Sequence, residues 1–298
     1  MIRLAIVALA MPLFQETSHD LAYGGKRGDK TPVRGEATLK LKLEGTEAIT
    51  NLVRSAMEFL SFSEIRIKGE GVRRVTKTAA KGAGIKIEYA TARVEGKYDD
   101  EPYGFDFERA APPGDLTTDK LKQTCWFLSM GGPDYRVGPK GEYASNDPKK
   151  DAWGEALDLA VNALVRLPEK PVASGAEWTS EWKGAYKQKD NDGIFAFRQK
   201  SRLEKVEEKG GRTLGRITFD TSGKLEIPEA KRDKNAEVQE TTFETKGTVL
   251  LDLGSGLVAS HECAGAVRAR YKAIDPNTGE THELKIDFEI TSKLGEKE

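Results

Sequence analysis

Long stretches in which apolar and polar residues alternate constrain this fold more than any other feature. In residues 36–43 the apolar positions are Ala37, Leu39, Leu41 and Leu43. A period of two is typical of a β-strand with one buried face. Comparable stretches occur at 64–75, 85–98, 103–109, 124–130, 134–137, 177–187, 193–207, 212–220, 240–253, 257–273 and 281–291.

Turn signals separate these stretches and favour antiparallel pairing. Residues 190–193 (Asp-Asn-Asp-Gly) and 275–279 (Asp-Pro-Asn-Thr-Gly) each lie between two predicted strands. Strands that follow one another through short turns form meanders more readily than parallel α/β sheets. The sequence therefore predicts an α+β fold, mostly β, with long curved antiparallel sheets as a half-barrel or as two packed sheets.

Two helices are expected to pack on these sheets, at about 47–60 and 148–166. Thr46 can cap the first, and its apolar residues recur at helical spacing; continuation of the preceding strand is the alternative. Asp147 reads as the N-cap of the second, with Pro148 at its first position. Because its apolar stripe is too wide for a surface helix, we expect it to be covered on most sides.

The second helix divides the 298-residue chain into two β-rich halves. We predict an N-terminal half at 19–146 and a C-terminal half at 147–298 that begins with the helix. Both halves have a similar order of elements, as in a distant duplication, and one continuous domain is the alternative.

Residues 1–18 resemble a secretory signal peptide. Arg3 precedes an apolar run from Leu4 to Phe14, and Ala8-Leu9-Ala10 is a small-x-small site, although a cut near residues 14–18 fits equally well. The run is too short to span a bilayer. We therefore predict an exported protein, periplasmic or extracellular, without a transmembrane span; a buried N-terminal strand is the alternative.

The charge balance argues against a nucleic-acid partner. Lys and Arg number 47 and Asp and Glu 48, so the formal net charge is -1. A nucleic-acid binder usually carries a basic excess that neutralises phosphates. No cofactor signature is present: Gly254-Ser255-Gly256 lacks the βαβ frame of a dinucleotide fingerprint and reads as a hairpin turn.

His261 and Cys263 are the weak candidates for a metal site or a thiol–imidazole pair. Two positions apart on a predicted strand, they share one face. Further ligands or an orienting carboxylate would have to come from elsewhere, so two buried side chains are the favoured interpretation. Cys125 and Cys263 could form a disulfide in an exported chain, and two buried thiols are an equal alternative.

Trp178 and Trp182 are the weak candidates for a ligand-binding surface. They also share a strand face, and aligned aromatic rings on an exposed sheet can stack on sugars. Because the chain has few large apolar residues, burial in the core is favoured over this role.

The order of short motifs resembles a family of secreted, β-rich proteins of unknown function from planctomycete-type bacteria. The motifs are the strand and Gly-bearing turn at 127–141, Leu167-Pro168, Gly175-Ala176-Glu177-Trp178, and the segments 215–220 and 247–254. The resemblance covers most of the chain beyond about residue 35 and implies no catalytic residues. More distantly, the pattern is similar to periplasmic lipoprotein-carrier half-barrels, in which a concave sheet holds a lipid chain under helices.

These observations predict a non-enzymatic, exported cell-envelope protein that binds a hydrophobic or lipidic ligand in a curved sheet. A surface module that contacts carbohydrate or protein through Trp178 and Trp182 is the alternative. A hydrolase or thiol enzyme that uses His261 and Cys263 is the third hypothesis.

Overall fold

The computed structural model describes most of the β-patterned parts of the chain. These are residues 17–47, 50, 62–79, 82–98, 101–109, 134–145, 159, 161–188, 191–228, 236–274 and 278–297. The predicted signal peptide up to residue 16, the predicted strand 124–130 and Cys125 lie outside them.

Strands account for most of the described residues. They are β1 (Ser18–His19), β2 (Lys30–Glu44), β3 (Phe62–Ala79), β4 (Gly82–Tyr98), β5 (Glu101–Glu108), β6 (Asp134–Val137), β7 (Tyr143–Ser145), β8 (Val172–Ala173), β9 (Glu177–Gln188), β10 (Asn191–Lys209), β11 (Arg212–Glu226), β12 (Ala236–Asp252), β13 (Val258–Ile274) and β14 (Thr281–Glu296).

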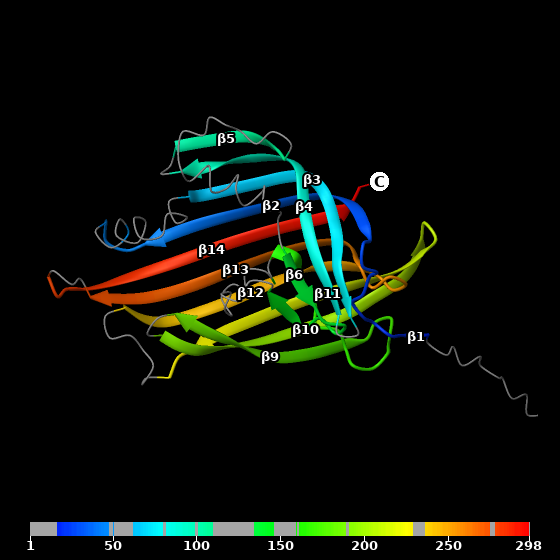
Figure 1. Ribbon diagram of the computed structural model, residues 1–298. Helices are drawn as coiled ribbons and strands as arrows, with labels where there is room; N and C mark the ends of the chain where they lie inside the picture. Colours follow the sequence, from blue (N-terminus) through cyan, green and yellow to red (C-terminus); the bar gives the residue numbers. More distant parts are fainter. Residues whose placement is uncertain are drawn as a thin grey trace, which may run out of the picture.

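One large antiparallel sheet dominates the fold (Figure 1). Its strand order is β7-β6-β4-β3-β2-β14-β13-β12-β11-β10-β9, and β5 also pairs with β4. The short strands β1 and β8 form a separate pair. The mostly β, antiparallel prediction is therefore confirmed. The sheet is neither closed nor strongly curled, so the expected half-barrel gives way to an open sheet.

Strands from both predicted halves belong to this one sheet. β2 pairs with β14 over twelve residues, with Leu41 opposite Phe288. The first and last long strands are thus neighbours, and the sheet continues without a break across the two halves.

Several predicted boundaries change. β11 runs to Glu226, beyond the predicted stretch 212–220, because Gly223 pairs with Phe197 and Phe243 on its two sides. β12 begins at Ala236, before the predicted stretch 240–253.

No helix forms an element within the described residues. Residues 47 and 50 have helical backbone, and the Thr50 N–H bonds the Thr46 carbonyl at 3.0 Å, whereas β2 stops at Glu44. The rest of the predicted helix 47–60 lies outside the described residues, as does most of 148–166. The end predicted at 166 is wrong: helical backbone stops at Asn162, since Ala163 has a φ of 49°.

The two faces of the sheet differ in polarity. We name the face that carries the buried side chains the inner face and the opposite one the outer face. In β11, Ile217 and Phe219 are buried, whereas Asp220 between Phe219 and the buried Thr221 is exposed. Alternation along every long strand places most of the apolar residues in one cluster on the inner face.

Additional segments pack on the inner face. β6 pairs with the start of β4, and Ile85 and Val137 belong to the same core cluster as Phe195 and Leu251. Leu21 and Tyr23 from the segment before β2 join that cluster. Within the described residues, no helix is long and apolar enough to cross a membrane.

We expect Phe243→Ala to destabilise the protein by about 3–5 kcal/mol, because it leaves a cavity under a fully buried ring. The adjacent Thr242 is only half-buried, so Thr242→Ala should cost below about 1 kcal/mol. Urea unfolding of both variants measures the difference. Equal losses would contradict the assignment of the two faces.

Candidate functional site

A short segment crosses the inner face of the sheet nearly at right angles to the strands. We name residues 161–167 the strap. Val161 hydrogen-bonds to His261 on β13, and Arg166 contacts Trp178 on β9. Since β12, β11 and β10 lie between those two strands, the strap spans five strands of the sheet.

The strap needs hydrogen-bond partners that the sheet backbone does not supply. Its residues 164–167 are neither helix nor strand, and Leu164, Val165 and Leu167 are buried. The backbone groups of the strands below already bond to neighbouring strands. Buried N–H and C=O groups that stay unpaired are costly, so side chains must provide the missing partners.

Gln199 on β10 supplies the central connection. Its Oε1 accepts a hydrogen bond from the Arg166 N–H at 2.6 Å, and its Nε2 donates to the Leu164 carbonyl at 3.1 Å. The same Nε2 also donates to Thr221 Oγ1 at 2.7 Å. Gln199 is only 1% exposed, yet its amide has partners on both oxygen and nitrogen.

Residues before β2 and after β6 hold the other side of the strap. The Val165 N–H donates to Tyr23 Oη at 3.0 Å, and the Leu167 N–H donates to the Lys140 carbonyl at 2.8 Å. Lys140 Nζ in turn bonds Asp20 Oδ1 at 2.8 Å. Burial raises the pKa of Tyr23 to about 12, although the bond from Val165 and the charge of Arg166 oppose the shift.

The sheet accommodates the strap with two rows of mostly small or polar inner-face residues. The first row, in register across β10 to β13, comprises Gln199, Thr221, Thr245 and Gly265. The second row, across β10 to β14 and β2, comprises Ser201, Phe219, Gly247, Cys263, Ser292 and Ala37. Apart from Phe219, these side chains leave room for a backbone above the sheet, and several supply polar atoms.

Trp178 and Trp182, the predicted ligand-binding candidates, both contact the strap. Trp178 Nε1 donates to the Arg166 carbonyl at 2.7 Å. The Trp182 ring stacks on Phe197, with centroids 5.1 Å apart, and the Arg166 guanidinium carbon lies 4.8 Å from the Trp182 centroid. Each ring is half-buried, and the contacts that a sugar would use are partly taken by the protein itself.

His261 also contacts the strap. It is 5% exposed, bonds the backbone of Val161, and its Nε2 lies 3.2 Å from Ser292 Oγ. Burial lowers the pKa of His261 to about 4; the Val161 bond opposes this shift and the positive charge of Arg73 adds to it. The imidazole is therefore neutral near pH 7.

Cys263 lies on the same face, and its environment disfavours the thiolate form. Burial raises its pKa to about 12, while hydrogen bonds with the Ser292 and Ala163 backbone act the other way. A reactive thiol–imidazole pair needs the reverse shifts, so the geometry favours packing of His261 and Cys263. Among the described residues, no three His, Cys, Asp or Glu side chains are placed to hold a metal ion. The Cys125–Cys263 disulfide stays a prediction.

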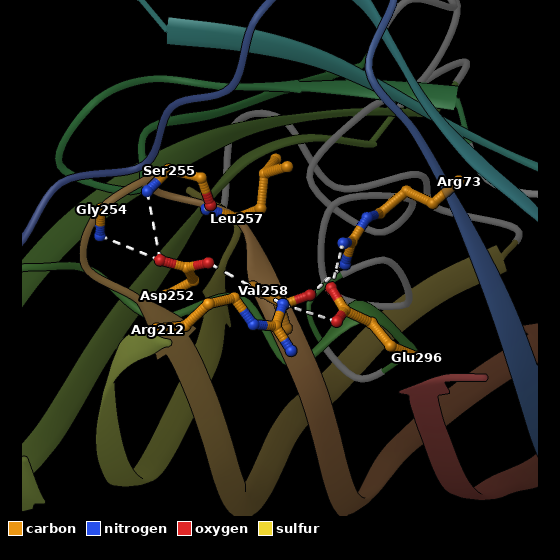
Figure 2. A network of polar contacts seen from close by, with 8 residues as sticks. All are labelled: Arg73, Arg212, Asp252, Gly254, Ser255, Leu257, Val258 and Glu296. Atoms are coloured by element: carbon orange, nitrogen blue, oxygen red, sulfur yellow. Dashed lines mark hydrogen bonds and ion pairs between the residues drawn. The ribbon is translucent and has the colours of Figure 1, made fainter. Parts of the chain in front are cut away.

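An ion-pair network closes the inner face at one end, which we name the near end (Figure 2). Arg73 on β3 is 4% exposed; its Nη2 bonds Glu296 Oε1 at 3.0 Å, and its Nη1 donates to the Val258 carbonyl. Arg212 Nη1 bonds the other Glu296 oxygen at 2.6 Å and lies 3.8 Å from Asp252 Oδ2. Glu296 thus compensates the buried charge of Arg73.

The turn after β12 completes this closure. Asp252 Oδ1 accepts hydrogen bonds from the Gly254 and Ser255 N–H groups at 2.9 and 3.2 Å (Figure 2). The cavity beside Arg73 and His261 measures about 20 Å³, room for about one water molecule. A cavity of that volume is too small for a substrate.

Comparisons with known proteins found no match to this chain, either among protein-family models or among curated proteins.

Sequence reasoning identified four residues that surround the strap but missed what connects them. Gln199, Tyr23 and Arg73 were not among the candidates. A signal for Gln199 was present: within 195–203 the inner positions run Phe, Phe, Gln, Ser, Leu, so a large polar residue interrupts an apolar face. Such a residue in a buried register indicates a specific polar partner.

We expect Gln199→Met to destabilise the protein by about 2–4 kcal/mol, since it leaves the Arg166 N–H and the Leu164 carbonyl buried without this partner. Lys200→Met changes the adjacent, exposed position and should cost less than about 0.5 kcal/mol. Chemical denaturation of both variants measures these costs. A loss in Gln199→Met no larger than in the control would refute the anchoring role.

The free energy of unfolding should also decrease as the pH decreases, because of His261. The pKa of this imidazole is about 4 when folded and 6.5 in its ordinary state, so only the unfolded chain gains the proton between those values. We expect a loss of up to about 3 kcal/mol as pH falls from 6.5 to 4. His261→Gln should lose that part of the pH dependence. If the free energy of unfolding depends on pH in the same way for the variant and the original protein over this range, the prediction is contradicted.

Proposed function

We propose that this chain is a non-enzymatic, exported protein that binds an apolar, lipid-like molecule on the inner face of its sheet. The supporting observation is an apolar part of that face that is only partly buried. We name it the apolar wing: Leu39, Leu41 and Leu43 on β2, Ile65 and Ile67 on β3, and Tyr103 and Phe105 on β5.

The apolar wing continues a face that is buried elsewhere. Leu41 pairs with Phe288 and Leu43 with Ile286, and both partners are less than 10% exposed. Leu39 in turn pairs with Ile65. The apolar surface therefore runs from β14 onto β3 with partly buried residues on β2 and β3, and it is buried again at Val94 on β4 and Phe107 on β5. A contiguous apolar surface that is not fully covered is typical of a binding site.

The near end of the inner face is closed, so the two ends of this face differ. Among the described residues there, the strap and the Arg73 ion pair lie beside a cavity of about 20 Å³, which is too small for a ligand. The apolar wing lies beside the strap. Ile65 and Ile67 continue the two strap rows onto β3, and Leu41 and Leu43 lie towards the opposite end of the strands. An open sheet with one apolar face suffices for this proposal, and a half-barrel is not required.

Export rests on the N-terminal sequence, in which Arg3 precedes the apolar run from Leu4 to Phe14. Neither the carbohydrate nor the thiol hypothesis gains an observation of its own, because Trp178, Trp182, His261 and Cys263 all have structural contacts around the strap.

Binding of cis-parinaric acid, a fluorescent fatty acid, to the delipidated protein tests the proposal. We expect saturable binding that Leu41→Gln weakens about fivefold or more, because about 1 kcal/mol of apolar contact is lost. Lys40→Gln, on the outer face of the same strand, should bind as the original protein does. A delipidated original protein that gives no saturable signal would overturn the proposal.

A further inference from the structure

The sheet divides between two of its inner strands at the end away from the ion-pair network, which we name the far end. The last pair between β11 and β12 is Lys224 with Thr242. Beyond it, β11 stays paired with β10 up to Glu226, and β12 stays paired with β13 back to Ala236. The facing edges of β11 and β12 are therefore not bonded to each other there.

This separation opens a groove of about 480 Å³, which we name the slot. It is lined by Ile194, Lys224, Leu225, Glu226, Ile227, Pro228, Val238, Gln239, Glu240 and Thr241. Leu225, Ile227 and Val238 are buried inner-face residues, whereas Lys224 and Glu226 are exposed. The slot thus has an apolar interior and a charged rim, and its volume lies in the range of small-molecule sites.

Thr241, one of the residues that line the slot, carries a buried hydroxyl. Thr241 is 1% exposed and pairs with Ala269 on the inner face. In the part of the chain that the structure describes, no group hydrogen-bonds its Oγ1. A hydroxyl can both donate and accept, so an oxygen function of a ligand would satisfy it.

Ile194 marks the mouth of the slot. Among the described residues, the exposed large hydrophobic side chains are Ile194 and Ile274, and only Ile194 lines the slot. Its side chain is 44% exposed next to the buried Leu225 and Ile227. An apolar chain that enters at Ile194 would therefore meet apolar contacts from the surface inward.

We propose that the slot is the opening through which a single-chain lipid reaches the inner face, with its oxygen head bonded to Thr241. This inference rests on the proposed function and names its ligand class more closely. The rim carries Lys224 but also Glu226 and Glu240, so its charge opposes a strongly anionic head such as a phosphate. The ligand class is a fatty acid, fatty alcohol or monoacylglycerol.

Two fluorescent probes and a matched pair of variants test the hydroxyl. cis-Parinaric acid carries an oxygen head, and diphenylhexatriene is a hydrocarbon that cannot hydrogen-bond. Thr241→Val keeps the shape of the side chain and should weaken parinaric acid binding about fivefold while diphenylhexatriene binding stays unchanged. Thr242→Val, at the adjacent outer position, should change neither.

A second pair of variants tests the opening and does not depend on a core substitution. Ile194→Trp fills the mouth of the slot from an exposed position and should weaken binding of both probes at least fivefold. Ile274→Trp adds the same bulk at the other exposed isoleucine, at the end of β13, and should leave both affinities unchanged.

The outcomes separate the two proposals. If the delipidated original protein binds neither probe, the proposed function fails and the slot with it. If it binds and Ile194→Trp behaves as Ile274→Trp does, the slot is overturned while the apolar wing remains the binding surface. If Ile194→Trp weakens binding but Thr241→Val does not, the assignment of the oxygen head is wrong.

Discussion

The backbone of the strap is the constraint on which the rest of this structure depends. A segment that lies across a sheet cannot join its ladder, yet its buried N–H and C=O groups must be bonded. Gln199, Tyr23, Trp178 and the Lys140 carbonyl provide those bonds. Tyr23 lies in the first third of the sequence, the other three lie in the middle, and His261 adds a hydrogen bond to Val161 from the last third. The strap thus joins all three parts of the chain into one buried polar network.

The inner face also has two parts that differ in how completely they are buried. On one side of the strap, Arg73 and Glu296 close the near end, and the space that remains fits about one water molecule. Beside the strap, the apolar wing is only partly buried, and at the far end β11 separates from β12.

The strands were predictable because the alternation of apolar and polar residues acts within a few neighbouring positions. Strands at 134–137, 177–188 and 281–296 form close to the expected positions, since a side-chain period of two selects extended backbone with one buried face. The true end of the second helix was not predictable from the sequence. Leu164, Val165 and Leu167 are buried in the strap, and buried residues are apolar in a strap as they are in a helix. Periodicity does not distinguish these two ways of burying a short apolar run.

By itself, the sequence determined the strands, their antiparallel class and the polarity of the two faces, because these follow from propensity and period over a few residues. Only the tertiary structure decided what His261, Cys263, Trp178 and Trp182 do. Their roles arise where the strap meets β13 and β9, strands that lie about 80 residues apart in the sequence, and no local pattern encodes a contact made by a segment crossing five strands. Burial was the favoured interpretation of all four residues from the sequence, and the tertiary structure adds their contacts with the strap.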